Sequence, residues 1–275
     1  MTKIRLDSLL VERNLADTRE KAKRMIMAGL VFNDEQRLDK PGMKVDDATS
    51  LRVKGKSLPY VGRGGLKLEK ALQYFSIDLN NRTMMDVGSS TGGFTDCALK
   101  NGAQLCYAID VGYNQLDWKL RNDERVIVME RTNFRYVTSD MIQYGQPDFA
   151  TIDVSFISLR LILPVLSQLL RSGSDVIGLI KPQFEAGREQ VGKKGIVRDK
   201  KVHKDVLDSV ITFVKEEGYQ LLDLTYSPIT GGDGNIEFLI HLGWEKKITE
   251  INKGPVDIMA LVEKAHQAFQ AKTTD

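Results

Sequence analysis

Two lysines and two carboxylates, widely separated in the chain, stand where strands or helices are expected to begin or end. They are Lys67 in GRGGLKLEKAL, Asp153 in IDVSF, Lys181 in LIKPQFE and Glu237 in GNIEFLI. A lysine that closes an apolar strand is unusual, because burying its charge is costly unless the amine is paired or loses its proton. Taken singly, each lysine is as readily explained as a solvent-facing side chain. Taken together, the four form a candidate group for holding and moving a proton.

A glycine-rich turn, DVGSSTGGFTD at residues 86–96, is the second chemical feature. A dinucleotide-binding turn needs a second glycine so that backbone can approach a pyrophosphate, but Ser90 stands two residues after Gly88. A P-loop ends in Gly-Lys-Ser or Gly-Lys-Thr, whereas Gly93 is followed by Phe-Thr. The turn therefore lacks a lysine that could neutralise a phosphate. Glycine and serine also occur in any tight strand-to-helix connection, so a purely structural turn remains an alternative.

Acidic or amide side chains close three successive strands in this region. Asp86 opens the turn, Asp110 ends YAIDVG, and Glu130 or Asn133 follows in MERTNFR. Negative charge would repel a phosphate but attract S-adenosylmethionine, which carries an ammonium and a sulfonium group. Asp110 is placed to accept the ribose hydroxyls, and Glu130 or Asn133 to meet the adenine. One such residue is more often a cap, but three in succession favour a methyl-donor site. The residues expected to bind this cofactor are Asp86, Gly88, Ser90, Gly92, Gly93, Asp110, Glu130 and Asn133.

Two classes of methyl acceptor are disfavoured by the residues after the fourth expected strand. Enzymes that methylate amino groups commonly carry Asn or Asp followed by Pro-Pro-aromatic there, and this chain has IDVSF. Methylation of a pyrimidine carbon needs an activated cysteine nearby, and the two cysteines, Cys97 and Cys106, lie elsewhere. Without a CxxC motif or a Cys/His cluster, we expect both to be core residues and expect neither a disulfide nor a metal site.

Seven apolar runs, separated by turns or helix-length segments, must position these residues. They read TMMDV, QLCYAID, VIVME, DFATIDV, DVIGLIK, YQLLDLTYS and IEFLIHL. Alternation of strands and helices predicts a Rossmann-like α/β fold, in which a parallel sheet is covered by helices and binds its ligand at the carboxyl ends of the strands. No helix-length segment separates the last two runs, so they should pair antiparallel.

The front of the chain carries an excess of positive charge. Residues 1–62 contain 13 Lys or Arg against 9 Asp or Glu. Leu6, Leu9 and Leu10 predict one short helix, and Ala22, Met25 and Ile26 a second that Asp17 or Thr18 can cap and Gly29 can end. GLVFND and ATSLRVKG then read as strands. The basic residues of the second helix fall off its apolar face, which suits either solvent or phosphate.

The segment VKGKSLPYVGRGG has the composition of a linker. It divides the chain into a small α+β domain at residues 1–58 and a large α/β domain at residues 59–275. The segment at residues 185–200, EAGREQVGKKGIVRDK, is glycine-rich and basic and is interpreted either as a loop that closes over RNA or as a plain surface loop.

The amino-terminal segment resembles the S-four-type RNA-binding domain over about its first 55 residues. The resemblance lies in Arg5-Leu6-Asp7, in Thr18-Arg19 at the start of the basic helix, and in Gly29-Leu30-Val31. This sequence departs from the family by placing Asp34 where an Asn-Gly hairpin usually has glycine. The resemblance implies RNA as a partner, and the residues we expect to contact it are Arg5, Arg19, Lys23 and Arg24.

The four ionisable residues resemble the Lys-Asp-Lys-Glu tetrad of FtsJ-like 2′-O-ribose methyltransferases. With DVGSSTGGFTD, RTNFR, DVSFISL and IKPQFE, nearly the whole chain resembles the TlyA family of ribosomal RNA cytidine 2′-O-methyltransferases, whose members are often called hemolysins. The resemblance implies a seven-stranded methyltransferase fold and ribosomal RNA or a ribosomal subunit as substrate. It also implies Lys67, Asp153, Lys181 and Glu237 as the catalytic group, in which we expect Lys181 to be the general base.

Other functions fit the sequence less well. A non-catalytic RNA-binding factor of ribosome assembly would be favoured by loss of a tetrad residue, and none is lost. A pore-forming toxin needs an amphipathic or apolar insertion segment, which the chain lacks. The start of the chain, MTKIRLDSLLVERN, does not have the apolar stretch of a signal peptide, so a cytoplasmic location is expected.

Overall fold

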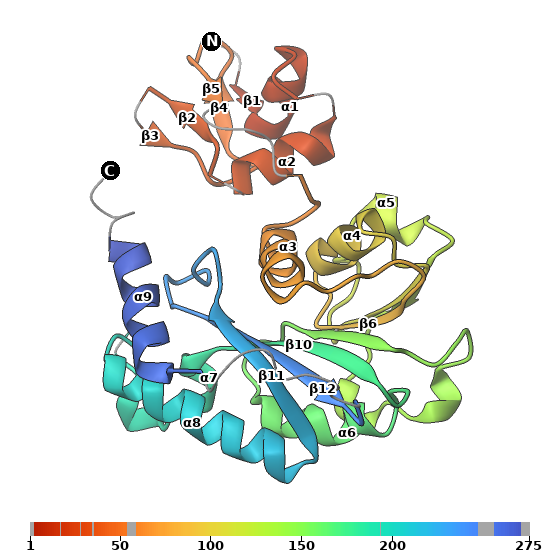
Figure 1. The fold of residues 1–275 in the computed structure, drawn as a ribbon. Helices are drawn as coiled ribbons and strands as arrows, with labels where there is room; N and C mark the ends of the chain where they lie inside the picture. Colours follow the sequence, from red (N-terminus) through yellow and green to blue (C-terminus); the bar gives the residue numbers. More distant parts are fainter. Residues whose placement is uncertain are drawn as a thin grey trace. The chain divides into compact units, whose positions relative to one another are not determined.

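The computed structural model describes residues 3–16, 18–27, 29–34, 36–53, 59–192, 194–246 and 256–270. It separates into two compact units, Met1–Arg63 and Gly64–Asp275. Figure 1 shows the helices and strands of each unit, and each is described by itself.

The first unit is a small α+β unit, as the sequence predicts. Its elements are β1 (Lys3–Arg5), α1 (Leu6–Glu12), α2 (Arg19–Met27), β2 (Val31–Asn33), β3 (Gln36–Arg37), β4 (Lys44–Asp46) and β5 (Arg52–Val53). Strand β1 pairs antiparallel with β4, and β2 lies between β3 and β5. The predicted apolar residues of both helices are buried, and all of them except Leu9 pack with Val31 and Leu38 into one core. Helix packing on short strands thus gives this unit a core of its own.

Turn residues set the ends of these elements. The Thr18 hydroxyl accepts a hydrogen bond from the backbone N–H of Lys21 at 3.1 Å, the contact of a helix cap; Asp17, the other predicted cap, lies outside the described residues. Gly29 ends α2 with φ +71°, a value that favours glycine. Asp34 takes φ +52° where β2 turns into β3. The Asp-for-Gly departure therefore keeps a left-handed turn, which Asp tolerates better than most residues.

A buried carboxylate organises the arginines of this unit. Asp7 has no exposed surface and contacts Arg5 at 2.8 Å and Arg19 at 3.3 Å. The hydrogen bonds from Arg5 lower the pKa of Asp7 to about 2; burial acts in the opposite direction, and Arg19 adds to the lowering. Arg5 and Arg19 are each about half exposed. Two predicted RNA contacts therefore also hold the fold of the unit together.

This arrangement predicts acid sensitivity. Because the pKa of Asp7 is lower in the folded chain than its ordinary value of 3.8, its contribution to stability is present above that value and is lost as the pH falls through about 2. With both arginines half exposed, we expect about 1 kcal/mol at pH 6. Urea unfolding of the full chain should show Asp7→Asn less stable than wild type at pH 6, with the difference shrinking as the pH falls to about 2 and below. The exposed Asp39→Asn is the control, and an Asp7→Asn difference that does not depend on pH would contradict the assignment.

The second unit is built on a seven-stranded sheet. Its strands are β6 (Thr83–Val87), β7 (Leu105–Ile109), β8 (Val126–Met129), β9 (Phe149–Ile152), β10 (Ser174–Ile180), β11 (Tyr219–Tyr226) and β12 (Phe238–Trp244). They lie in the order β11-β12-β10-β9-β6-β7-β8. Strand β12 runs antiparallel to both of its neighbours, and the pairs among β10, β9, β6, β7 and β8 are parallel. This confirms the predicted parallel sheet with an antiparallel last strand.

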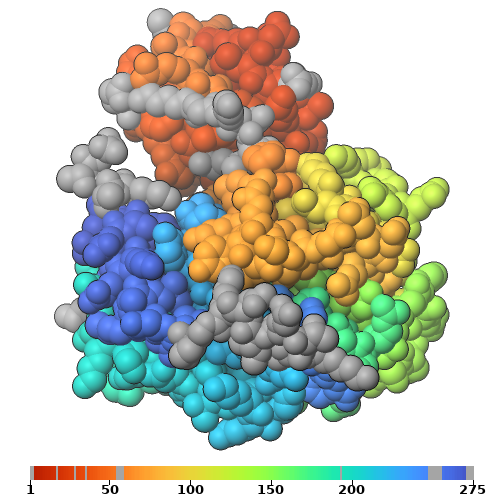
Figure 2. Space-filling view, in the orientation of Figure 1, coloured from red at the N-terminus to blue at the C-terminus, as the bar shows by residue number. Residues whose placement is uncertain are grey.

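Helices cover both faces of this sheet (Figure 1). They are α3 (Gly64–Phe75), α4 (Gly93–Lys100), α5 (Trp118–Arg121), α6 (Leu163–Ser167), α7 (Pro182–Glu185), α8 (Lys200–Glu216) and α9 (Ile258–Gln270), with short 3₁₀ turns η1 (Phe134–Tyr136), η2 (Ser139–Met141), η3 (Leu159–Leu161) and η4 (Arg188–Gln190). Helices α3, α4 and α5 lie on one face, and α6 and α8 on the other. Helix α9 packs against α8 and shows at the surface as the dark blue segment in Figure 2. The sheet is therefore buried on both sides, which explains its nearly continuous apolar strands.

Two smaller findings bear on function. Cys97 and Cys106 are both buried, and burial raises the pKa of the Cys106 thiol, so both are core residues as predicted. In the ranges that the structure describes, no helix combines the length and the apolar character needed to cross a bilayer.

Candidate active site

The sheet brings the four predicted catalytic residues together at one edge. Asp153 follows β9 and Lys181 follows β10, so both lie at the carboxyl ends of parallel strands. Glu237 directly precedes β12, and because β12 is antiparallel, its start lies at the same edge. Lys67 comes from the first turns of α3. Glu237 therefore joins the other three residues because β12 runs antiparallel to its neighbours.

The four side chains form a chain of ion pairs. Lys67 Nζ lies 2.8 Å from Glu237 Oε2 and 3.2 Å from Asp153 Oδ2, and Lys181 Nζ lies 2.5 Å from Asp153 Oδ1. The side chains of both lysines and of Glu237 are less than a tenth exposed, and that of Asp153 is 17% exposed. Two positive and two negative charges balance, which is the condition for burying them together.

The electrostatics distinguish the two lysines. Burial acts to lower the pKa of Lys67, but the charges of Asp153 and Glu237 outweigh it and the pKa is raised. Burial likewise acts to raise the pKa of Asp153, yet Lys67 and Lys181 together hold it below its ordinary value. Among the described residues, Lys181 contacts one carboxylate where Lys67 contacts two. Lys67 is thus held as a cation between two carboxylates, whereas Lys181 pairs with Asp153.

The glycine-rich turn lies against this group. Gly88 has φ +87°, and a Cβ there would stand 2.6 Å from the backbone carbonyl oxygen of Asp153. Gly92 has φ +91° and precedes α4, whose first residue is the buried Gly93. A side chain at Gly88 would push the Asp153 backbone away. Glycine is therefore required for the turn and the tetrad to lie so close together.

Asp110 connects the turns that follow β6 and β7. Its Oδ2 accepts the backbone N–H of Ser90 at 2.8 Å, and its Oδ1 accepts that of Gly112 at 2.7 Å. Ser90 itself has φ +48°. The carboxylate is half-buried, and each oxygen retains a lone pair for a further donor. Asp110 is thus both a structural acceptor and a residue open to a ligand.

Asp86 faces inward instead. It has no exposed surface, and it accepts hydrogen bonds from Thr95 N, Thr95 Oγ1 and Thr151 Oγ1 at 3.1, 2.7 and 2.9 Å. Burial raises its pKa to about 6 although the threonine bonds oppose this, Thr95 foremost. Its side chain ties the turn to α4 and β9. The charge of Asp86 is therefore buried below the turn and does not face solvent. The sequence did not identify its two partners, Thr95 and Thr151.

The residues expected near the adenine lie in the turn after β8. Glu130 pairs with Arg121 Nη2 at 2.5 Å and accepts the Gln115 N–H at 3.2 Å. Asn133 caps η1 through the backbone N–H of Arg135 at 3.2 Å. Both are half-buried and lie in the predicted turn after β8. Each also has a structural partner within the chain.

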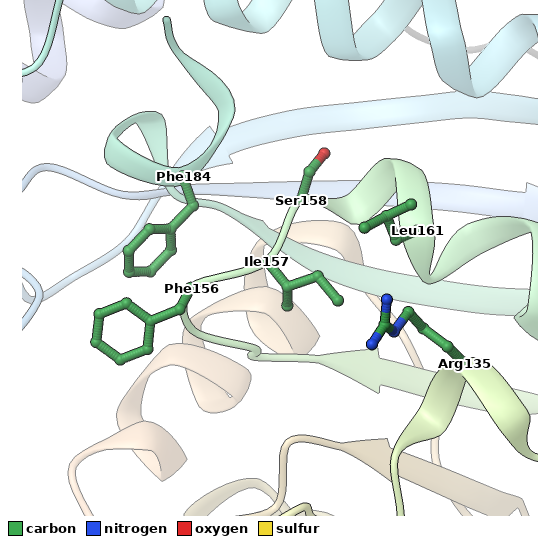
Figure 3. Close-up of a pocket in the computed structure, with 6 residues that line it drawn as sticks. All are labelled: Arg135, Phe156, Ile157, Ser158, Leu161 and Phe184. Carbon is green, nitrogen blue, oxygen red and sulfur yellow. The ribbon is translucent and has the colours of Figure 1, made fainter. Parts of the chain in front are cut away.

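An aromatic pocket beside the tetrad was not predicted from the sequence. Phe156 is 91% exposed with φ +64°, and its ring lies 5.1 Å from that of Phe184. Figure 3 shows these two rings at one end of a pocket and Arg135 and Leu161 at the other. Its volume is about 500 Å³. The available signal was spacing, since each phenylalanine stands three residues after Asp153 or Lys181.

Ser155 was also missed. Lys181 Nζ donates a hydrogen bond to the Ser155 hydroxyl at 3.3 Å. In the first unit, Lys23 and Arg24 are half-buried and lie on α2, the helix that also carries the Asp7-bound Arg19. The structure thus groups the tetrad and the three turns in one unit and the expected RNA contacts Arg5, Arg19, Lys23 and Arg24 in the other.

Comparison with known proteins agrees with this arrangement. The FtsJ-like methyltransferase family model matches residues 60–244, and the S4 domain model matches residues 4–49. YqxC of Bacillus subtilis is 64% identical over 274 residues, covering 99% of this chain and 98% of that protein. The 16S/23S rRNA (cytidine-2'-O)-methyltransferase TlyA of Mycobacterium tuberculosis is 42% identical over 239 residues, covering 86% of this chain and 89% of its own.

A solved structure from Streptococcus thermophilus, provisionally named a hemolysin, is similar over the full length of both chains. It is 51% identical to this chain and superposes with a TM-score of 0.79.

Proposed function

Since this chain belongs to the TlyA family of FtsJ-like methyltransferases, we propose that it transfers a methyl group from S-adenosylmethionine to the 2′-hydroxyl of a cytidine ribose in ribosomal RNA. The observation that carries the proposal is the buried, charge-balanced group of Lys67, Asp153, Lys181 and Glu237 beside a glycine-rich turn. The activity named for the Mycobacterium tuberculosis relative supports the choice of acceptor.

The three turns fit S-adenosylmethionine by their chemistry. Gly88 and Gly92 leave room beside the backbone, and Asp110 offers free lone pairs at the place where a ribose would lie. Glu130 and Asn133 follow the next strand. The buried charge of Asp86 favours a cationic ligand over a phosphate. When bound, S-adenosylmethionine supplies an electrophilic methyl group on a sulfonium.

A ribose 2′-hydroxyl is a weak nucleophile and must lose its proton as it attacks. Lys67 and Glu237 orient the hydroxyl through the Lys67 ammonium and the Glu237 carboxylate. Lys181 Nζ accepts the proton, which requires that the amine be neutral before the step. Asp153 lies 2.5 Å from Lys181 and holds it in place. Its negative charge stabilises the ammonium that forms. Positioning and proton transfer together account for the chemistry that the protein supplies.

The nucleobase of the target nucleotide is assigned to the aromatic pocket. An unstacked base gains most from an aromatic face on which it can stack, and Phe156 offers a face that is 91% exposed. Phe184 backs it, and Arg135 at the far end suits a neighbouring phosphate. A stacked base would place its ribose toward Asp153 and Lys181, each three residues away in sequence.

RNA binding and catalysis are assigned to different domains. Residues 1–58 bind RNA through the basic face of α2, and residues 59–275 hold the cofactor and transfer the methyl group. The catalytic group and the three cofactor turns all lie beyond residue 63, which supports this assignment.

The function is tested by incubating the full chain with methyl-labelled S-adenosylmethionine and, separately, with small subunits, large subunits and deproteinised ribosomal RNA. We expect label in RNA from at least one of these substrates and none in a reaction without the chain. Label that stays with protein, or no label with cofactor binding intact, would contradict the proposal.

The cofactor assignment predicts the effect of Asp110→Ala. The change removes acceptors for two ribose hydroxyls and for two backbone N–H groups. At about 1.5 kcal/mol for each of the two hydrogen bonds to a charged acceptor, or about 3 kcal/mol in all, affinity for S-adenosylmethionine should fall by roughly a hundredfold. Calorimetry measures this directly. Asp123→Ala, which breaks a surface ion pair with Arg125, is the control, and equal affinities for the two variants would remove Asp110 from the site.

The RNA assignment predicts a change in salt dependence. Replacing Lys23 with glutamine deletes one cation of α2, so the slope of log affinity against log salt should become shallower by about one. Filter binding of ribosomal RNA between low and moderate salt gives this slope. Cofactor affinity should not change. If the slope stays at its wild-type value, Lys23 makes no phosphate contact.

A further inference from the structure

A buried amide outside the tetrad joins two loops of the second unit. Asn235 is 1% exposed. Its Oδ1 accepts the backbone N–H of Val197 at 3.0 Å, and its Nδ2 donates to the backbone carbonyl of Gly195 at 2.8 Å. Both ends of the carboxamide are therefore used, and both partners lie about 40 residues earlier in the chain. Buried polar groups satisfied in this way specify one arrangement of the backbone.

The loop that Asn235 holds carries positive charge at its surface. In residues 187–199, the side chains of Arg188, Lys194 and Arg198 are exposed, while Val197 is 2% exposed. A cavity of about 500 Å³ opens here, lined in part by Lys194 and Arg198. The loop is thus anchored from within, and at its surface Arg188, Lys194 and Arg198 outnumber the exposed carboxylates of Glu189 and Asp199, as a surface for an extended anion requires.

Asn235 also stands close to the catalytic group in sequence, two residues before Glu237. The Asn235 carbonyl accepts the N–H of Gly231 at 2.9 Å, and the Glu237 carbonyl accepts that of Ser227 at 2.8 Å. A Cβ on Gly231 would lie 2.7 Å from Glu237 Oε1, so the carboxylate packs directly on this backbone. The backbone at residues 231–237 therefore fixes Glu237 and, through the Asn235 side chain, also holds the loop at residues 187–199.

We infer that Asn235 is a positioning residue that couples the basic loop at residues 187–199 to Glu237. The loop takes the phosphate backbone of the RNA substrate, and the shared segment then sets Glu237 against Lys67. The inference rests on the proposed function. It explains why a buried, uncharged polar residue is placed between a surface loop and the catalytic group.

Substitution of Asn235 tests the tether first. Asn235→Ala leaves the buried Val197 N–H without its acceptor, so hydrogen exchange at Val197 should accelerate in the full chain. Cofactor affinity and the unfolding temperature report whether the fold is retained. Should Asn235→Ala fail to fold, Asn235→Asp keeps an acceptor for Val197 and cannot donate to Gly195. Asn122→Ala, which loses a contact of Asn122 with the Trp118 carbonyl, is the matched control.

Coupling is then tested by a double-mutant cycle with Lys194→Gln under single-turnover conditions at saturating RNA. In wild type, Lys194→Gln should lower both RNA affinity and the transfer rate, the rate by roughly tenfold. In the Asn235→Ala background, where the rate is already lower by a similar factor, it should lower only affinity. Equal rate effects in the two backgrounds, or a folded Asn235→Ala with the wild-type rate, would overturn the inference.

The same data separate this inference from the proposed function. If the wild-type chain transfers no label to RNA, the proposed function fails and the inference fails with it. If the wild-type chain transfers label and the Asn235 variants match it, only the inference fails.

Discussion

Replacing Lys181 with alanine is expected to lower the single-turnover rate of methyl transfer by about a hundredfold or more, the usual contribution of general-base catalysis. Binding should change much less, because the proposal assigns cofactor binding to the glycine-rich turn and RNA binding to the amino-terminal domain. The transfer rate should therefore fall while the affinities for cofactor and RNA stay nearly unchanged. This combination indicates an interaction that is made only in the transition state. Rates with saturating RNA, together with cofactor calorimetry, measure both quantities.

Lys181→Arg distinguishes a base from an electrostatic clamp. Arginine preserves the positive charge beside Asp153 but does not lose its proton at accessible pH. If Lys181 accepts the proton, Lys181→Arg should be about as slow as Lys181→Ala across the pH range. Near-wild-type transfer by the arginine variant would assign Lys181 to charge stabilisation and make Asp153 the next candidate.

Asp153→Asn should produce the second large effect. Asp153 is the carboxylate that Lys67 and Lys181 share, at 3.2 and 2.5 Å. Removing its charge leaves Lys67 with Glu237 and leaves Lys181 without a carboxylate among the described residues. Breaking such a buried pair costs about 3 to 5 kcal/mol, and a misplaced base should lower the rate by about a hundredfold. Thermal unfolding and single-turnover rates measure the two effects.

The same variant separates two roles for Asp153. A residue that positions Lys181 leaves cofactor affinity intact, whereas a residue that holds the methionine end of the cofactor weakens it. We expect unchanged affinity. The control is Asp123→Asn at the surface pair with Arg125, which should leave stability within about 0.5 kcal/mol of wild type. A wild-type rate in Asp153→Asn would remove this residue from the catalytic group.

The sheet could be predicted because its signals are local. All seven strands follow from apolar runs between turn residues, and the reversal of β12 follows from the absence of a helix between the last two runs. That reversal also predicts that Glu237, at the start of β12, lies at the same edge as Asp153 and Lys181, which follow β9 and β10. Strand topology thus brings three of the four residues together, and Lys67 joins them from α3.

The features that could not be predicted depend on which way side chains turn. Asp86 and Asp110 both lie at strand ends, but only the fold shows that Asp86 is enclosed by two threonines while Asp110 stays half open. Arg5 and Arg19 read as free cations in the sequence, and the structure pairs both with buried Asp7. Such partners lie across the fold, where periodicity carries no information.

Phe156 and Asn235 were missed for different reasons. An exposed phenylalanine at positive φ breaks the local rules of burial and backbone preference, and such violations concentrate at functional sites. Asn235 in GGDGNIE looks like an ordinary turn residue, and its importance comes from contacts with Gly195 and Val197. Neither feature has a signature in composition or spacing that is specific enough to act on alone.

The central claim, methylation of a ribose hydroxyl, is tested most directly by alkaline hydrolysis of RNA that the chain has labelled from S-adenosylmethionine. A 2′-O-methyl group removes the hydroxyl that attacks the adjacent phosphate, so the bond beside it survives. We expect all label in alkali-resistant dinucleotides whose 5′ residue is cytidine, and at an equal early time about a hundredfold less of it when Lys181→Ala replaces the wild-type chain. Label recovered in ordinary mononucleotides would place the methyl group on a base and contradict the account.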